Sequence, residues 1–193
     1  MPYSVEHKLR TRERIVVSAR RLFNRFGFAQ VTIEQIMADA ELTRGGFYNH
    51  FTNKEELFCE AVSSYITCNP LATRIEETGI HPDTPRTLAR MLINMYLSDE
   101  VFDNDALHCP LYALPSDVSR TGLSQAAYTD LIRAMTSVYH MACAGGDDAQ
   151  KRAQSIVSLC VGGMVLARTT NDSGLRQSLR AAARDQALKL LDG

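Results

Sequence analysis

The sequence predicts an all-α protein of about nine helices. Apolar residues recur at intervals of three and four along most of the 193-residue chain, which is the spacing of one face of a helix. Polar clusters that contain proline or glycine separate these segments, and no segment alternates apolar and polar residues as a half-buried strand does. Hydrophobic residues make up 45% of the sequence, so the chain can bury a sizeable core.

The first predicted helix runs from Arg10 to Gly27, and Gly27 suits a left-handed cap at its C-terminus. Its apolar stripe consists of Ile15, Ala19, Leu22, Phe23 and Phe26. Residues 1–9 show no clear stripe, so we expect a flexible arm there.

Two short helices around a tight turn are predicted next. Thr32 and Gln35 have the spacing of a capping box, so a helix begins there, with Ile33, Ile36, Met37 and Ala40 as its apolar stripe. Glu41–Thr43 supplies the turn, and residues 44–51 supply a second helix in which Phe47 and Phe51 face inward together. The residues left facing outward are Thr43, Arg44, Gly45, Tyr48 and His50.

This outward face suits double-stranded DNA, because arginine pairs with guanine edges and hydroxyls contact phosphates or bases. Thr52 and Glu55 repeat the capping-box spacing and place Lys54 in the first turn of the next helix. A cation is electrostatically misplaced at a helix N-terminus unless an anion lies nearby, and a DNA phosphate would be such an anion. The alternative is a solvated lysine.

The charge distribution agrees with a polyanion bound at one end. Residues 1–54 hold nine Lys/Arg against five Asp/Glu, a net charge of +4, whereas residues 55–193 have a net charge of −5. A basic run such as residues 8–14 is also compatible with an ordinary solvated helix face.

Residues 46–57, with the sequence GFYNHFTNKEEL, resemble the signature of the TetR family of bacterial transcriptional regulators. The resemblance covers about residues 10–60. It implies a DNA-binding domain over residues 1–53 and an effector-binding and dimerisation domain over residues 54–193. By position, it implies that Tyr48 and Lys54 bind phosphates, that Thr43, Arg44 and Gly45 read base edges, and that His50 packs or contacts phosphate. Thr32 completes the predicted DNA-binding set.

The rest of the chain is helical by pattern. Helices are predicted at residues 57–66, 88–96, 123–143, 147–170 and 172–191, with a short helix after Pro110. The predicted interruptions are a break at Pro70, a loop at 78–85, an irregular segment at 101–107 and a break at 115–122. The helix at 123–143 should end at Gly145 and Gly146.

The last two helices are the candidate dimer interface, because a helix-turn-helix protein normally reads two half-sites as a two-fold dimer. The residues that we expect to bury in a four-helix interface, or alternatively in an ordinary core, are Ile156, Leu159, Cys160, Gly163, Met164, Ala167, Leu175, Leu179, Ala182, Ala183, Gln186 and Leu190.

Five of the seven methionines and five of the seven tyrosines lie from residue 65 onward, and together they suit an adaptable pocket for a small-molecule effector. For any one of these residues ordinary core is the preferred reading, so the pocket prediction concerns the set as a whole. The candidate pocket residues are Met91, Met95, Tyr96, Phe102, Cys109, Tyr112, Tyr128, Met135, Tyr139 and Met164.

Cys109 supports an alternative reading, a thiol-based sensor. A cysteine at a helix start beside His108 can have a lowered pKa, although a buried, inert thiol is the preferred reading, because free cysteine is among the most buried residue types. A third reading is a DNA-binding scaffold without an effector. An enzyme is not expected, because the sequence shows no nucleophile and base constellation. No metal site is expected, because the five cysteines lack the spacing of zinc ligands, and no cofactor is expected, since no glycine-rich phosphate loop is present. No run is apolar enough to span a membrane, so we expect a cytoplasmic homodimer, most simply a repressor released by its effector.

Overall fold

A computed structural model describes residues 5–143 and 148–193, which form eleven α-helices and two short 3-10 helices, with no strand among them. The all-α prediction is confirmed, and the helix count exceeds the expected nine by two. Within these described ranges, no helix has both the length and the apolar character needed to cross a membrane.

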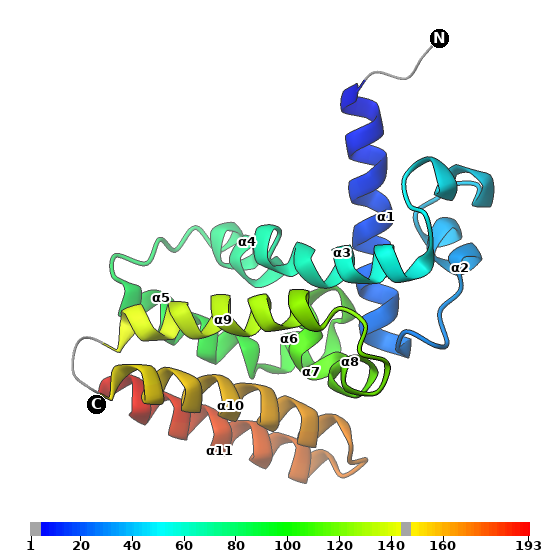
Figure 1. Ribbon diagram of the computed structural model, residues 1–193. Coiled ribbons are helices and arrows are strands. Elements are labelled where there is room, and N and C mark those ends of the chain that lie inside the picture. Colours follow the sequence, from blue (N-terminus) through cyan, green and yellow to red (C-terminus); the bar gives the residue numbers. More distant parts are fainter. Residues whose placement is uncertain (1–4, 144–147) are drawn as a thin grey trace.

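The N-terminal part consists of α1 (Val5–Phe26), α2 (Ile33–Asp39) and the 3-10 helix η1 (Arg44–Asn49), and α1 stands across the remaining helices (Figure 1). The helix begins at Val5, so the predicted arm is wrong for residues 5–9, and residues 1–4 lie outside the described part. Gly27 has φ +79°, and its N–H donates to the Phe23 carbonyl at 2.8 Å, which confirms the left-handed cap. Phe26 is 50% exposed and does not belong to the buried stripe.

The apolar stripes of these helices meet in one core. Phe47 and Phe51 are 0% and 2% exposed and their rings lie 5.7 Å apart, so their predicted role as core residues is confirmed. Phe23 packs edge-on against Phe58 of α3 (Lys54–Thr67) at 5.2 Å, which joins the core of the N-terminal part to the rest of the protein.

The larger part is layered around α9 (Gln125–Ala142), which packs against α3, α5 (Pro85–Tyr96) and α10 (Ala149–Arg168). Helices α3 and α4 (Pro70–Glu77) lie on one side of it, and α10 with α11 (Ser173–Asp192) forms the opposite outer layer (Figure 1). Asp172 caps α11 by accepting from the Leu175 N–H at 3.0 Å, as the sequence predicts. The predicted boundaries at Gly145, Gly146 and Asp147 lie outside the described residues.

Two segments predicted to be irregular are helical. Residues 99–121 form α6 (Asp99–Asp103), the 3-10 helix η2 (Asp105–Leu107), α7 (Pro110–Ala113) and α8 (Pro115–Thr121). Pro70, Pro85, Pro110 and Pro115 each stand at the start of a helix, where the missing N–H costs nothing, so these prolines begin helices and do not break them.

Helices α10 and α11 pack closely because Gly163 has no side chain. A Cβ at Gly163 would lie 2.7 Å from the Ala183 Cβ, whereas a Cβ at Gly162 would meet nothing within 4 Å. Five α10 residues that were predicted for a dimer interface, or alternatively for an ordinary core, are buried inside this chain, so the core alternative holds for them: Ile156, Cys160, Gly163, Met164 and Ala167. On α11 the same holds for Ala183.

Candidate nucleic-acid interface and ligand cavity

The turn between α2 and η1 is held by local hydrogen bonds. The Thr32 hydroxyl accepts from the Gln35 N–H at 3.2 Å, and the Gln35 side chain accepts from the Thr32 N–H at 2.8 Å, which confirms the capping box. Glu41 adopts a left-handed conformation with φ 55°, and the Leu42 N–H donates to the Met37 carbonyl at 2.8 Å. The start of η1 is thereby fixed against α2.

The predicted second helix is a 3-10 helix and not an α-helix, which agrees with the low helix propensity of Gly45 and Gly46. Thr43, Arg44, Gly45 and Tyr48 are exposed on its outer side. Tyr48 is 60% exposed, and its ring packs edge-on against buried Phe47 at 5.2 Å. The outward face is therefore present, and its ring is oriented by a core residue.

Arg44 is available to a ligand although it has a partner. Its Nε lies 2.9 Å from a Glu34 carboxylate oxygen, and both side chains are largely exposed. Ion pairs of this kind contribute little, so the guanidinium can exchange Glu34 for a base edge at small cost. No atom lies within 4 Å of a Cβ built at Gly45, which leaves room for another backbone to approach.

His50 is half-buried behind this face. Desolvation, together with the nearby cations Lys8 and Arg12, lowers its pKa below 6.5, so the ring is neutral at pH 7. Its backbone carbonyl accepts a hydrogen bond from Arg12. This environment favours the packing role of His50 over a cationic phosphate contact.

Lys54 has partners inside the chain. Its Nζ donates to the carbonyls of Phe28 at 2.9 Å and Val31 at 3.0 Å, and it lies 4.2 Å from the Phe28 ring centroid. The sequence argument assumed that a DNA phosphate was needed to balance the Lys54 ammonium. Because two carbonyls of the chain already accept hydrogen bonds from it, that argument does not hold. The cap of α3 also lies one residue later than predicted, because Asn53 accepts from the Glu56 N–H at 2.8 Å.

The arginines of residues 1–54 are likewise engaged. Each of the seven contacts a carboxylate or a carbonyl: Arg10 with Glu6, Arg12 with Glu60, Arg14 with Ala40, Arg20 with Cys68, Arg21 with Asp39, Arg25 with Asp105 and Arg44 with Glu34. The net charge of this part overstates the positive charge that is free to meet DNA.

Several contacts join the end of α1 to the η2–α8 segment. The Asn24 side chain donates to the His108 carbonyl at 2.7 Å, Arg25 lies 3.0 Å from Asp105, and the Phe28 N–H donates to Asp117 at 3.2 Å. A movement of the η2–α8 segment would therefore displace the end of α1, because these contacts join the two.

A cavity of about 140 Å³ opens between α3, α4, α5 and α9. It is lined by Tyr65, Ile66, Asn69, Leu71, Leu92, Tyr96, Leu131, Ala134, Met135, Val138 and Tyr139. Three of the ten predicted pocket residues line it: Tyr96, Met135 and Tyr139. The residues on α3 and α4 were missed because their apolar pattern is that of ordinary core, and only the packing of α4 across α5 shows that they border a space.

Five of the predicted pocket residues lie elsewhere. Met91 and Met95 are half-buried on α5 outside the cavity, Met164 is 0% exposed in the core, and Phe102 lies under the Arg180 guanidinium at 4.6 Å. The Tyr128 hydroxyl donates to the Leu111 carbonyl at 2.6 Å. None of these five residues lines the cavity.

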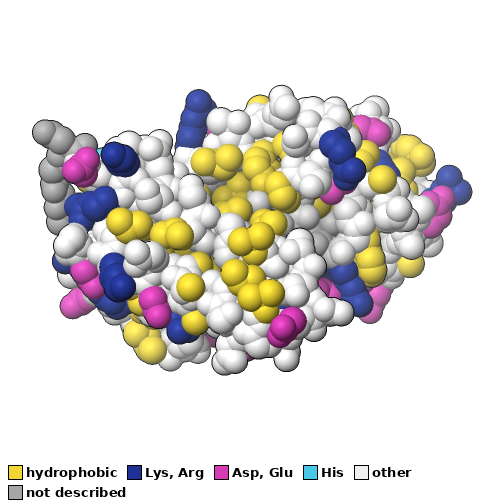
Figure 2. Space-filling model, turned by 90° about the horizontal axis from the view of Figure 1, so that it is seen from below, with side chains coloured by type: hydrophobic (Ala, Val, Ile, Leu, Met, Phe, Trp, Pro, Cys, Tyr) yellow, Lys and Arg dark blue, Asp and Glu magenta, His cyan; other side chains and the backbone are white. Residues whose placement is uncertain are grey.

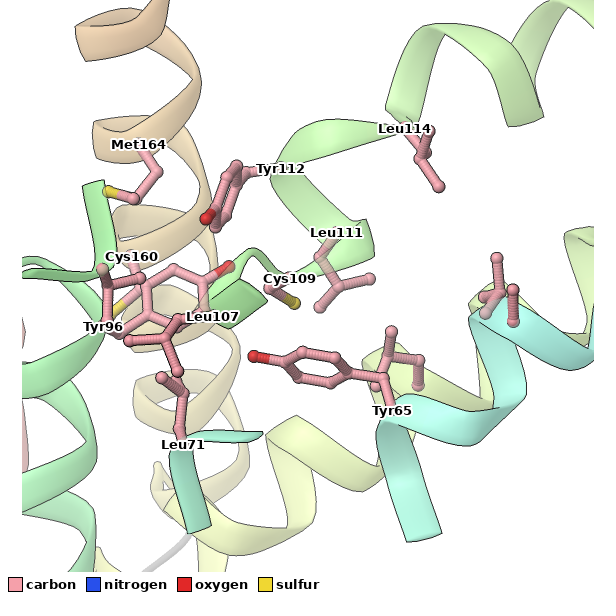
Figure 3. Packing of buried hydrophobic residues seen from close by; sticks show 14 of the residues in the cluster. Tyr65, Leu71, Tyr96, Leu107, Cys109, Leu111, Tyr112, Leu114, Cys160 and Met164 are labelled. Carbon is pink, nitrogen blue, oxygen red and sulfur yellow. The ribbon is translucent and has the colours of Figure 1, made fainter. Parts of the chain in front are cut away.

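Cys109 and Tyr112, the remaining two, are buried next to the cavity residues Tyr65 and Tyr96 (Figure 3). Cys109 is 0% exposed, and burial raises the pKa of its thiol to about 11. The buried thiol is therefore confirmed, and the lowered pKa of the thiol-sensor alternative is wrong, because α7 is only four residues long and desolvation outweighs its N-terminus.

Comparison with known proteins agrees with the motif. Residues 15–61 match the model of bacterial regulatory proteins of the tetR family. The chain is 31% identical over 88 residues to the uncharacterised HTH-type transcriptional regulator YerO of Bacillus subtilis, covering 46% of this chain and 30% of YerO. It is 30% identical over 91 residues to the HTH-type transcriptional regulator TtgR of Pseudomonas putida, covering 47% of this chain and 43% of TtgR.

The chain thus spans less than half the length of these curated relatives. Over the whole fold it is similar to the crystal structure of a TetR-family transcriptional regulator from Cytophaga hutchinsonii, with a TM-score of 0.74, 19% identity, and coverage of 99% of this chain and 98% of that one. The resemblance predicted from residues 46–57 is confirmed, and the proteins matched are named as regulators and not as enzymes.

Proposed function

We propose that this chain, which carries the N-terminal domain of the tetR family in residues 15–61, is a homodimeric transcriptional regulator that binds operator DNA and releases it when a small molecule binds. The observation that carries the proposal is the exposed face of η1, formed by Thr43, Arg44, Gly45 and Tyr48 on a turn fixed by a capping box.

In this proposal the face enters the major groove. Arg44 exchanges Glu34 for a guanine edge, Gly45 lets the backbone approach, and the Tyr48 hydroxyl contacts a phosphate. Thr32 and Thr43 are exposed at the starts of α2 and η1, where their hydroxyls can donate to phosphates. Lys54 supports this face by holding the segment before α2, and His50 packs behind it.

The outer face of α10 and α11 supports the dimer. Leu166 is 54% exposed and Leu175 is 46% exposed, and on the same two helices Ala182 is exposed and Gly162 is half-buried. Figure 2 shows this side of the molecule, where hydrophobic side chains cross the middle and charged ones lie toward the edges. A two-fold partner on this face would bury the stripe and pair the two DNA-binding surfaces.

Release would follow from linkage between the cavity and the DNA-binding face. Helix α3 carries Lys54 at its start and Tyr65 in the cavity wall, and the η2–α8 segment contacts α1 through His108 and Asp105. A ligand that binds better to an arrangement with badly spaced DNA-binding surfaces weakens operator affinity by that difference. We propose residues 1–53 and 54–193 as the two functional parts, joined at α3.

A repressor of this kind is preferred to a thiol sensor, since Cys109 is buried with a raised pKa. It is also preferred to a scaffold without an effector, because the protein has a cavity that residues of α3 help to line.

The experiment is selection of bound duplexes from a random pool, repeated with Arg44→Ala. We expect the wild type to enrich a two-fold symmetric sequence, and Arg44→Ala to lose preference at one position in each half-site. Arg133→Ala is the matched control, because Arg133 is also exposed and paired with a nearby carboxylate, but on α9. Enrichment of the same sequence by Arg44→Ala, or no enrichment by the wild type, would contradict the proposal.

A further inference from the structure

We propose that the cavity binds an uncharged molecule of about one ring that carries a single hydrogen-bonding oxygen, and that Tyr65 and Tyr96 recognise this oxygen. This inference rests on the proposed function, since it names the chemical class of the effector.

The size of the cavity limits the ligand. Its volume of about 140 Å³ is close to that of an engineered apolar cavity of about 150 Å³ that holds benzene. A single ring with one small substituent fills such a space, whereas fused polycyclic compounds and long acyl chains do not fit without a rearrangement of the walls.

The walls limit its charge. The described residues that line the cavity include no aspartate, glutamate, lysine, arginine or histidine. Leu71, Leu92, Leu131 and Val138 supply apolar surface from three helices, and Asn69 is the polar residue besides the tyrosines. An ion that entered would lose its hydration without gaining a partner of opposite charge, so an uncharged ligand is favoured.

The tyrosines supply the polar end. Tyr65 is 3% exposed and Tyr96 is 2% exposed, and neither hydroxyl has a hydrogen-bond partner of acceptable geometry among the described residues. Both hydroxyls point toward the Cys109 sulfur, and the Tyr112 hydroxyl, which also lacks such a partner, lies close to them (Figure 3).

Such a cluster is unusual, because most buried side-chain polar atoms are hydrogen-bonded. Sulfur is a weak acceptor and satisfies these groups poorly. Burial raises the pKa of both phenols well above 10, so each hydroxyl keeps its proton and can donate. A ligand oxygen that reached the hydroxyl ends of the two rings would give a phenol the hydrogen-bond partner that it lacks.

The test measures binding to the full-length protein by calorimetry, without DNA, at pH 7.5. The probes are toluene, 4-methylphenol and benzoate, which are similar in size and differ in polarity and charge. We expect 4-methylphenol to bind at least tenfold more tightly than toluene, and benzoate to bind more weakly than either.

The variants Tyr65→Phe and Tyr96→Phe assign the oxygen site. At least one should reduce the preference for 4-methylphenol over toluene to about twofold or less, while the affinity for toluene is kept. Tyr128→Phe is the control, since its hydroxyl is bonded to the Leu111 carbonyl and Tyr128 does not line the cavity. Its preference should equal that of the wild type.

Three results would overturn the inference: tighter binding of benzoate than of 4-methylphenol, no binding of toluene or 4-methylphenol, or an unchanged preference in both Phe variants. Operator binding is then measured separately. Ligand binding with the expected preference but unchanged operator affinity would refute the effector function and leave the ligand class standing. Release of the operator by an anionic compound that competes for the cavity would refute the uncharged ligand class and leave the effector function standing.

Discussion

Replacing Lys54 with methionine tests whether this lysine stabilises the fold or binds DNA. Its ammonium donates at 2.9 and 3.0 Å to two carbonyls that lie 26 and 23 residues upstream, and it faces the Phe28 ring at 4.2 Å. Lys54→Met keeps an apolar stem of similar length and a good helix former, so the charge and the two hydrogen bonds are what it removes.

The expected cost follows from these contacts. A hydrogen bond to a charged group contributes about 1.5–3 kcal/mol when buried. Lys54 is only half-buried, and water can reach the carbonyls once the ammonium is gone, so we expect about 2 kcal/mol for both bonds together. The contact with Phe28 adds about 0.5–1 kcal/mol. For a chain of this size the total lowers Tm by about 5–10 °C.

Differential scanning calorimetry measures this shift, with Lys151→Met as the control, because Lys151 is an exposed lysine on α10. The control should melt within about 1 °C of the wild type. The slope of log K against log salt for DNA binding should be unchanged in Lys54→Met. A variant that melts like the wild type and loses about one unit of that slope would refute the argument and return Lys54 to the role of a phosphate ligand.

Three further predictions concern the dimer face, the thiols and the response to pH. Leu166→Glu places a charge on the exposed stripe of α10, so it should give a folded monomer in sedimentation velocity at concentrations where the wild type is a dimer. Equal sedimentation coefficients for the variant and the wild type would exclude this face as the dimer interface. Exposed Cys68 should react with an aromatic disulfide reagent at pH 8 in seconds to minutes, whereas buried Cys109, with a pKa of about 11, should react only on unfolding; fast labelling of Cys109 in the native protein would contradict its burial. Desolvation and Arg168 lower the pKa of His108 below 6.5, so below about pH 6.5 the unfolded chain binds more protons than the folded one and the free energy of unfolding should fall. His108→Gln should show a smaller fall between pH 6.5 and 5 in urea titrations. An identical fall in the variant and the wild type would rule out this contribution.

Local signals in the sequence predicted the parts of the structure that depend on local physics. The capping box at Thr32, the left-handed cap at Gly27 and the inward pair Phe47 and Phe51 each depend on residues within four positions, and each is present. Spacing was sufficient to predict them, because the bonds and contacts that define each feature join residues at most four positions apart.

Features that depend on distant residues were not predictable in the same way. Lys54 could not be paired from sequence with carbonyls more than 20 residues away. Pro70 and Pro115 could not be assigned as helix starts, since proline stands both at the first position of a helix and in a break.

The cavity required the packing of four helices, and the apolar residues of α10 could be divided into inner and outer faces only once α11 was placed against Gly163. The tyrosine and methionine content indicated that this part of the chain could form an adaptable pocket, but it could not identify the side chains that line the cavity.

The most direct test of the central claim is equilibrium binding of the selected operator and of a scrambled duplex of equal length by the wild type and Arg44→Ala. We predict that the wild type prefers the operator by about 10³-fold or more, and that Arg44→Ala loses about 1–3 kcal/mol of this discrimination while it binds the scrambled duplex almost as before. Equal discrimination by both proteins, or none by the wild type, would contradict the claim that the exposed face of η1 reads DNA.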